Sequence, residues 1–281
     1  DNLSNYLSNN NIKYIKLDSV LDIAAPTSEK NFIGTLPEFS YIDLSKSPDN
    51  MIGVYWRNEW GTKDFDLSCI SEDDTKIGWD SNYYNGNKDN DFIQIFSGDM
   101  TDADPEATEI HYFSNKNNQL KPCVFYNNRY NGLNNSKFKL FFAQCQPNLD
   151  TFNNSKAYMV DPKDILFETM MVSNKKEQVI GVVSENKYVF TDLQLSQRSV
   201  SGLSDDDFNY DVNNMIIGCV TEKAHSRLSL NDLLYAIAED NDIKFVDENT
   251  PEDELKSISE DEMLNLNLKS INKDTLLEMF R

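Results

Sequence analysis

The sequence predicts a mainly β protein, in which an antiparallel β-sandwich over residues 41–202 is followed by a small, acidic α-helical region over 203–281. Three observations predict this class. The apolar and aromatic runs between 41 and 202 are short, and Asn-Gly and Ser-Gly steps separate them. After residue 203 the apolar spacing becomes helical. The total of 281 residues is enough for one large domain or two modest ones.

Residues 1–40 form a mixed N-terminal lead-in. The asparagines at 9–11 break any helix, and Pro26 and Pro37 favour irregular structure. We expect a strand or a short helix around residues 12–21.

The central region holds eight segments with the composition of strands, bounded by turn residues. Between the sixth and the seventh of these, residues 161–164 (Asp-Pro-Lys-Asp) predict a turn that opens one helical turn. The eight predicted strands are 51–56, 65–70, 92–96, 109–113, 123–126, 138–143, 178–183 and 187–193.

Three start signals predict helices in the C-terminal region. Ser229 to Asp232 form a capping box before an apolar face. Pro251 fits just inside a second helix start, and residues 274–280 fit a final short helix. The region holds 19 acidic and seven basic residues, which favours a solvated face over a docking surface for a basic partner.

Charge and hydropathy exclude several classes. A formal net charge of −21 argues against binding of nucleic acid or anionic lipid, both of which need a basic surface. No apolar run approaches the ~20 residues of a membrane span, and no secretory signal stands at the start. We therefore expect a cytoplasmic protein. Because the chain begins with Asp1, we expect it to be processed or to be a piece of a longer protein.

Cysteine and histidine give no sign of a metal or catalytic centre. Cys69, Cys123, Cys145 and Cys219 form no Cys-x-x-Cys pair, so we expect free thiols. The two histidines, at 111 and 225, are too far apart for a His-rich site. Phosphate-loop, dinucleotide, zinc-protease and nucleophile-elbow motifs are also missing from the sequence.

Carboxylates are the remaining candidates for chemistry. On a strand, alternation puts Asp64, Asp66 and Ser68 on one face, where two carboxylates ~7 Å apart repel unless a cation lies between them. Residues 97–109 form a second acidic cluster with five carboxylates, and Gly98 permits its turn. Its spacing is not that of an EF-hand. Each cluster also fits a solvated acidic strand edge or turn, but loops at one end of a sandwich meet in space.

An ordered series of motifs runs along the predicted sandwich. The series comprises Trp56, Asp64-Phe65-Asp66-Leu67-Ser68, Gly78-Trp79-Asp80, Tyr83-Tyr84-Asn85 and Ser97-Gly98-Asp99-Met100-Thr101. It resembles the TerD family of tellurium-resistance and stress proteins, and residues 168–171 through 187–190 also resemble the last hairpin of that family. The resemblance covers roughly residues 50–240, and is nearest to TerD-like C-terminal regions of larger bacterial proteins with an N-terminal RING-like module.

The resemblance implies a non-enzymatic β-sandwich that binds Ca²⁺ and engages a protein partner in a bacterial or phage stress response. Two departures, Gly86 in place of a second asparagine and Pro105 in a shorter acidic loop, argue against a two-ion site. The oligomeric state is left open. The implied metal ligands are Asp64, Asp66, Asp99, Asp102, Asp104 and Glu109.

Two other functions remain open. One is a metal-independent structural or assembly module, such as a virion or scaffold component. The other is a hydrolase that uses Asp66 and Asp99 as a carboxylate pair, with Trp56, Trp60 and Trp79 nearby as candidate aromatic walls or as sandwich core. Fold alone does not decide between these functions.

Overall fold

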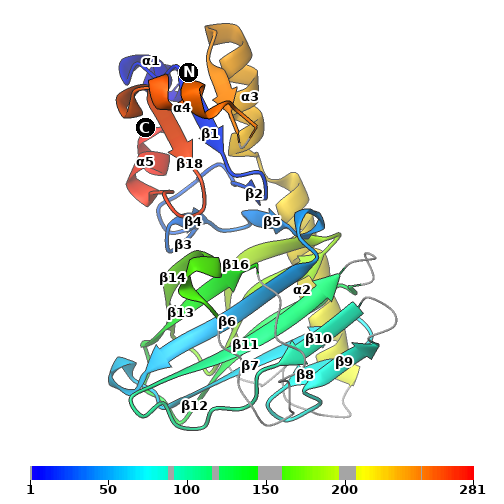
Figure 1. Cartoon of the computed structure of the whole chain (residues 1–281). Coiled ribbons are helices and arrows are strands. Elements are labelled where there is room, and N and C mark those ends of the chain that lie inside the picture. Colours follow the sequence, from blue (N-terminus) through cyan, green and yellow to red (C-terminus); the bar gives the residue numbers. More distant parts are fainter. Residues whose placement is uncertain (1, 88–91, 116–119, 145–159, 196–206, 248) are drawn as a thin grey trace. The chain divides into compact units, whose positions relative to one another are not determined.

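The computed structural model describes residues 2–87, 92–115, 120–144, 160–195, 207–247 and 249–281 (Figure 1). The chain is mainly β. It divides into two compact units, which are treated separately below. Unit 1 combines Asp1–Asp43 with Ser226–Arg281, and unit 2 spans Leu44–His225.

Unit 2 contains two antiparallel sheets. One has the strand order β14-β13-β6-β11-β10-β9, and within this unit the other runs β16-β15-β12-β7-β8. The elements, in chain order, are η1 (Leu44–Lys46), β6 (Asp49–Arg57), η2 (Asn58–Trp60), β7 (Asp64–Ser71), β8 (Lys76–Gly78), β9 (Tyr84–Asn87), β10 (Phe92–Phe96), β11 (Glu106–Asn115), β12 (Cys123–Tyr130), β13 (Ser136–Ala143), η4 (Pro162–Asp164), β14 (Ile165–Ser173), β15 (Glu177–Ser184), β16 (Lys187–Leu195) and α2 (Asp207–Ser226).

Aromatic pairs across the two sheets form the core of this sandwich. Phe65 of β7 packs against Phe138 of β13, with ring centroids 5.1 Å apart. Phe167 of β14 lies 5.1 Å from Phe190 of β16 in the same way. Trp56 is fully buried beside Phe65, and its Nε1 donates a hydrogen bond to the carbonyl of Lys63. These pairs confirm the predicted antiparallel sandwich.

All eight predicted strands are confirmed: 92–96 coincides with β10, and each of the other seven lies within a longer strand. The predicted turn at 161–164 is also confirmed: Asp161 caps the single helical turn η4 through a hydrogen bond from Lys163 N. The sequence prediction missed β8, which has only three residues, and β9, whose Asn-Gly step indicates a turn rather than a strand. In β14 the alternation was overlooked, although Phe167 and Met171 are buried and Glu168 is exposed.

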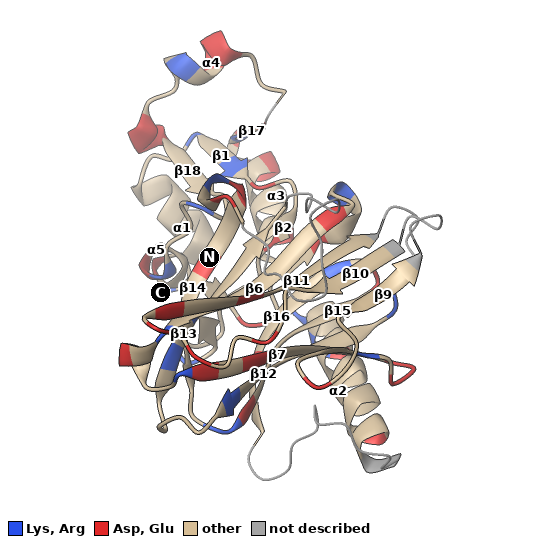
Figure 2. Cartoon of the chain, turned by 60° about the horizontal axis from the view of Figure 1, so that its bottom comes forward, with Lys and Arg blue, Asp and Glu red and all other residues tan. Residues whose placement is uncertain are grey.

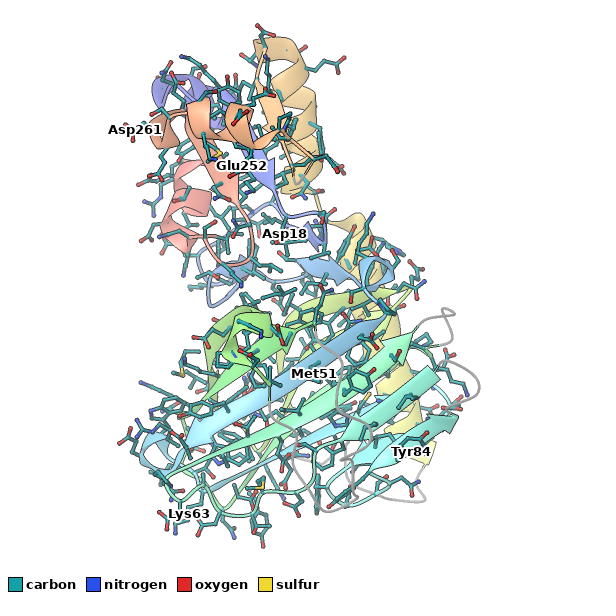
Figure 3. All side chains as sticks on the ribbon, viewed as in Figure 1. Asp18, Met51, Lys63, Tyr84, Glu252 and Asp261 are labelled. Carbon is teal, nitrogen blue, oxygen red and sulfur yellow. The ribbon has the colours of Figure 1, made fainter. Side chains whose placement is uncertain are left out.

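The face of the six-stranded sheet opposite the sandwich core carries a second apolar cluster. Met51 of β6 belongs to this cluster (Figure 3). Its neighbours along the strand alternate in direction, so Ile52 and Val54 face the sandwich core instead. Tyr84, also labelled in Figure 3, packs against its edge. This sheet therefore has apolar residues on both faces.

Helix α2 packs on the other sheet of unit 2. Asn213 fixes it there, since its Nδ2 donates to the carbonyl of Ser71 in β7 and its Oδ1 accepts from the hydroxyl of Tyr126 in β12. Ile216 and Val220 of the same helix are buried. In the part of the chain that the structure describes, neither α2 nor any other helix is long and apolar enough to cross a membrane.

Unit 1 is built around a small parallel sheet with the order β17-β1-β18. Ile15 in the central strand β1 is fully buried, as are Leu234 of α3 and Leu276 of α5. The elements are α1 (Asn2–Asn9), β1 (Tyr14–Leu17), β2 (Leu21–Asp22), β3 (Phe32–Ile33), β4 (Leu36–Pro37), β5 (Tyr41–Asp43), α3 (Leu230–Asn241), β17 (Lys244–Val246), α4 (Glu252–Ser257), η5 (Glu260–Glu262), β18 (Met263–Leu266) and α5 (Lys273–Glu278).

The expectations for the two ends of the chain hold only in part. The asparagines at 9–11 do end a helix, α1, and the helix starts at 229 and 274 are confirmed by side-chain caps from Ser229 and Asn272. At the second start signal Pro251 is the N-cap of α4, not its first residue. The C-terminal region also contains strands β17 and β18, which the helical prediction missed because each has four residues or fewer.

The compact units do not follow the predicted boundaries at residues 40 and 202. The N-terminal lead-in and the last 56 residues build one unit, because β1 lies between β17 and β18 and pairs with both. Arg227 also joins the two segments through an ion pair with Asp22. Helix α2, assigned from sequence to the C-terminal region, lies within unit 2 as far as His225.

Unit 1 gives the first prediction. Ile15→Ala removes a buried side chain from the strand to which both neighbouring strands bond, so it should lower the stability of unit 1 by about 2–5 kcal/mol. Amide hydrogen exchange in β17 and β18 should accelerate together. The exposed substitution Ser8→Ala in α1 is the control and should leave exchange unchanged. Unaltered protection of β17 and β18 in Ile15→Ala would contradict the central role of β1.

Candidate metal centre

Strand β7 places its polar residues on one face and packs its apolar residues on the other. Phe65 packs into the sandwich core, so the alternate residues Asp64, Asp66 and Ser68 lie on the opposite face, as the sequence predicts. Burial on that face is nevertheless high: Asp64 is 8% and Asp66 6% exposed. In the ladder with β12, Asn128 stands directly opposite Asp66 and so shares its face.

Asp99 comes from the loop that follows β10 in the other sheet. Gly98 precedes it with a φ of +112°, a conformation that favours glycine. Strand β11 holds the loop in place, because Ser97 N donates to the carbonyl of Ile110 and Ser97 Oγ accepts from Ile110 N. The position of Asp99 is therefore set by backbone pairing rather than by its own side chain.

Asp64, Asp66 and Asp99 form a group of carboxylates, called here the acidic triad. Each offers an oxygen that lies within 4.8 Å of those of the other two. The Oδ1 atoms of Asp64 and Asp99 are buried and accept no hydrogen bond. Figure 2 shows the acidic positions of β7 in red. Like charges at this separation repel strongly in a partly desolvated site, so the triad is unfavourable without a cation or a proton.

The pKa values of the triad reflect this cost. Burial, followed by the charges of Asp99 and Asp102, raises the pKa of Asp64 to about 6. Burial and the neighbouring carboxylates, Asp64 first, raise the pKa of Asp66 to about 7 against the opposing effect of Lys76. Burial also raises the pKa of Asp99. The triad therefore binds protons at a pH where ordinary aspartates are ionised.

Glu109 supports the triad but is not part of it. It is fully buried in β11; its Oε2 accepts from Leu67 N of β7 at 2.7 Å, and its Oε1 accepts from Met100 N of the acidic loop at 2.8 Å. Burial raises the pKa of Glu109 well above the ordinary value, although both hydrogen bonds oppose this. The carboxylate thus connects β7 to the loop that carries Asp99, a positioning function that sequence spacing did not reveal.

Asp102 and Asp104, the remaining ligands implied by the family resemblance, lie on the surface. The Oδ1 of Asp102 is 3.8 Å from Lys63 Nζ, and both side chains are largely exposed. Asp104 is exposed and precedes Pro105 through a cis peptide bond. Neither joins the acidic triad in the part of the chain that the structure describes.

The sequence analysis missed a basic residue beside the triad. Lys76 of β8 is almost fully buried, forms an ion pair with Asp80 and lies 5.4 Å from the ring centroid of Trp79. Burial lowers its pKa, while Asp80, Glu177 and Asp66 oppose the shift. The available signal was the spacing of Lys76 and Asp80, which lie four residues apart, the first in β8 and the second in the turn that follows it. Lys76 supplies one positive charge against the combined charge of Asp66, Asp80 and the rest of the triad.

The histidine at 111 and the cysteines lie outside the acidic triad. His111 is fully buried and stacks on Phe96, and burial lowers its pKa to about 3, so it is neutral. Cys69, Cys123 and Cys219 are free thiols, and Cys145 lies outside the described residues.

The three tryptophans do not form a common wall. Trp56 belongs to the core, Trp60 is half-buried against Tyr55, and Trp79 is 36% exposed beside Lys76. The prediction of sandwich core therefore fits Trp56 but not Trp79.

No family model, curated protein or solved structure matches this chain. The likeness to the TerD family consequently rests on the sequence motifs described above.

The support that Glu109 gives to the triad can be measured. Glu109→Ala leaves the amides of Leu67 and Met100 buried without acceptors, so the free energy of unfolding should fall by at least about 2 kcal/mol. Exchange of those two amides should accelerate most. Glu168→Ala, which removes an exposed partner of Lys139, should change stability by less than about 1 kcal/mol. Equal stability of both variants would contradict the positioning function.

The triad also predicts an unusual dependence of stability on pH. Folding raises the pKa values of Asp64 and Asp66 above the value of about 3.9 that they have in the unfolded chain. Their contribution to the free energy of unfolding is therefore greatest below about pH 3.9. It is lost as the pH rises through about 6 and 7. In the presence of a chelator, the melting temperature should therefore fall between pH 5 and pH 8, and Asp66→Asn should reduce this fall. A melting temperature that rises over the same interval would show that the triad is not strained.

Proposed function

We propose that unit 2 is a TerD-like, calcium-binding, non-enzymatic interaction domain of a bacterial or phage stress-response protein of the tellurium-resistance type. The observation that carries the proposal is the acidic triad, with its two buried carboxylate oxygens that accept no hydrogen bond. Buried charges in proteins are normally paired or bound to metal. The motif series that contains these aspartates supports the family assignment.

Calcium fits the donor set better than a transition metal does. The triad offers only carboxylate oxygens, which suit Ca²⁺, Mg²⁺ or Mn²⁺, whereas Zn²⁺ and copper favour nitrogen or sulfur. Calcium takes six to eight oxygen ligands, and buried Ser68 Oγ lies on the same face of β7 without a hydrogen-bond partner. Bound Ca²⁺ would neutralise the repulsion within the triad and fix the loop of Asp99 against β7.

Two partly exposed, large apolar side chains support a protein partner: one adjoins Asp99 of the triad, and the other adjoins Asp80, which is paired with Lys76. Met100 follows Asp99 directly, Trp79 precedes Asp80, and both side chains are 36% exposed. Exposed aromatic and methionine side chains are enriched at protein interfaces. A cation that orders the Asp99 loop would therefore also order the position of Met100 in this surface.

The metal-independent structural module is the alternative that a specific observation favours. Lys76 already places a buried positive charge near Asp66, and protonation can relieve the remaining repulsion. In this alternative the triad is a strained but unliganded part of the sandwich. For the carboxylate-pair hydrolase, the proximity of Asp66 and Asp99 is the supporting observation. The cavity of about 480 Å³ near Asp18 and the cavity of about 470 Å³ near Phe141 are both lined by other residues.

Thermal melting with Ca²⁺, with Mg²⁺ and with chelator tests the proposal. Calcium at 100 times its dissociation constant should stabilise the protein by about 2.7 kcal/mol, which raises the melting temperature of a unit of this size by roughly 5–10 °C. Asp66→Asn and Asp99→Asn should abolish that rise. Both should also raise the melting temperature in chelator, because they remove a repelling charge.

A variant that loses the calcium-induced rise but melts at a higher temperature in chelator has lost a metal ligand. A substitution that merely destabilises the fold would lower the melting temperature in chelator. Asp74→Asn makes the same charge change at an exposed turn with a φ of +64°, and it should retain the full response to calcium. Hydrogen exchange around Asp64 and Asp99 should slow when Ca²⁺ is added. Identical melting and exchange with Ca²⁺ and with chelator would favour the structural module instead.

A further inference from the structure

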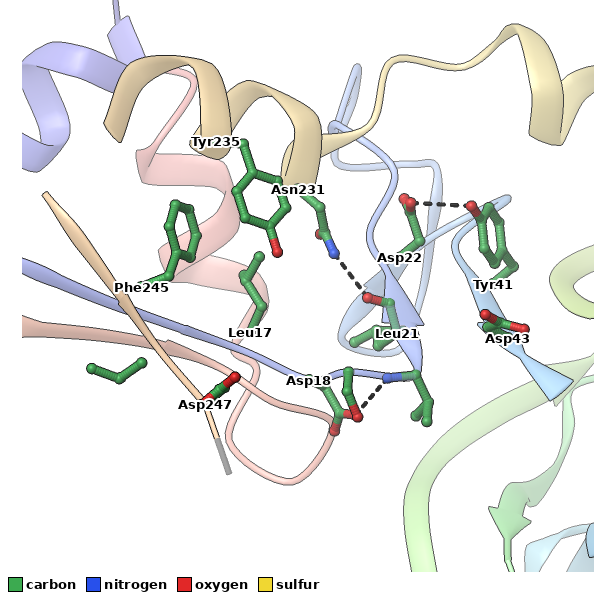
Figure 4. A pocket seen from close by; sticks show the side chains of 13 residues that line it. Leu17, Asp18, Leu21, Asp22, Tyr41, Asp43, Asn231, Tyr235, Phe245 and Asp247 are labelled. Atoms are coloured by element: carbon green, nitrogen blue, oxygen red, sulfur yellow. Dashed lines mark hydrogen bonds between the residues drawn. The ribbon is translucent and has the colours of Figure 1, made fainter. Parts of the chain in front are cut away.

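Unit 1 contains a cavity of about 480 Å³ at the carboxyl ends of its parallel strands (Figure 4). Residues 17–22, which end β1 and follow it, form one side, and Phe245 to Asp247 at the end of β17 form another. Tyr41 and Asp43 of β5 and Asn231 and Tyr235 of α3 complete the lining. Ligands of open parallel sheets typically bind at this edge, because the loops after the strands diverge there.

The lining carries four aspartates, Asp18, Asp22, Asp43 and Asp247. Asp22 is neutralised by the ion pair with Arg227 and also accepts the hydroxyl of Tyr41. Among the described residues no Lys or Arg pairs with Asp18 or Asp247. Their carboxylates bond only to amides and hydroxyls nearby: Asp18 to the amides of Val20 and Leu268, and Asp247 to residues 249 and 250. The cavity therefore keeps a net negative charge.

Aromatic rings supply the other surface of the cavity. Tyr235 stacks on Phe245, with ring centroids 4.3 Å apart and planes at 33°. Tyr235 is nevertheless 53% exposed, so this pair presents ring surface beside the carboxylates. A second ring in the lining, that of Tyr41, already carries the guanidinium of Arg227 at 4.8 Å from its centroid. Unit 1 thus already binds one guanidinium, that of Arg227, between the ring of Tyr41 and the carboxylate of Asp22. The cavity offers the same two residue types, tyrosine and aspartate, to a second cation.

We propose that this cavity binds an organic cation, a guanidinium or primary ammonium group, between the Tyr235–Phe245 pair and the carboxylates of Asp18 and Asp247. Charge complementarity excludes anions, and the aromatic surface favours a cation with a flat or weakly hydrated head over a bare metal ion. Among the described residues, the carboxylates that lie close enough together to hold a metal ion are those of the acidic triad in unit 2, not the aspartates of this cavity. Both an arginine side chain of a peptide and a free amine have the required chemistry.

Binding can be tested by NMR titration of the full chain with arginine amide and citrulline amide, both acetylated at the α-amine, with cadaverine and with an N-acetylated Gly-Arg-Gly peptide. Arginine amide should shift the resonances of residues 17–22, Tyr235 and Phe245. Citrulline amide, which has nearly the same shape without the charge, should bind at least about tenfold more weakly. Stronger binding of the tripeptide than of cadaverine would identify a peptide side chain as the source, and the reverse order would identify a free amine.

Two variants and two controls make the test specific. Asp247→Asn keeps an oxygen acceptor for residues 249 and 250, and Tyr235→Ala removes an exposed ring, so both should fold and bind the cation at least about fivefold more weakly. Asp240→Asn, an exposed acid of α3 outside the lining, should bind normally. Asp99→Asn should also bind normally, which separates this cavity from the proposed calcium site.

The proposal is overturned if citrulline amide binds as well as arginine amide, or if Asp247→Asn and Asp240→Asn weaken binding equally. Failure of all three cationic probes to shift the resonances of residues 17–22 at about 10 mM would overturn it as well. None of these results depends on whether unit 2 binds calcium.

Discussion

The buried carboxylate of Glu109 is the interaction on which the candidate site depends. It belongs to β11 in one sheet, and it accepts backbone hydrogen bonds from Leu67 in the other sheet and from Met100 in the acidic loop. Burial of a carboxylate is costly, and two hydrogen bonds from backbone amides offset part of that cost. In return, the side chain fixes the distance between Asp66 on β7 and Asp99 on the loop. A sandwich without this connection would leave the two acidic segments independent.

Several charged side chains of unit 2 lie where hydration is poor, which is unfavourable for each of them. Asp64, Asp66 and Asp99 lie close together where solvent reaches them poorly, and Lys76 is buried nearby in an ion pair with Asp80. The sandwich tolerates this because its stability comes from aromatic packing between the sheets, which does not involve the triad. Strain of this kind, concentrated at one place in an otherwise regular fold, is typical of functional sites.

Unit 1 concentrates charge in a different way. Its parallel sheet brings the ends of β1 and β17 together, so that Asp18 and Asp247 line one cavity although 228 residues separate them in the sequence. Ring stacking between Tyr235 and Phe245 adds a surface that bare metal ions do not require. The acidic triad and this cavity therefore differ in chemistry: the triad offers carboxylate oxygens close to one another, and the cavity combines carboxylates with aromatic faces.

The sequence by itself determined what depends on neighbours along the chain. Short apolar runs bounded by turn residues determined the eight predicted strands. Alternation determined the common face of Asp64 and Asp66, and a local cap determined the helix start at Ser229. Only the tertiary structure decided that Glu109 acts as a connector, that Lys76 lies near Asp66, and that both chain ends share one unit. The physical reason is that short strands such as β17 and β18 have too few residues for a periodic signal. Their pairing, like the burial of an acid, is settled by partners far away in the sequence.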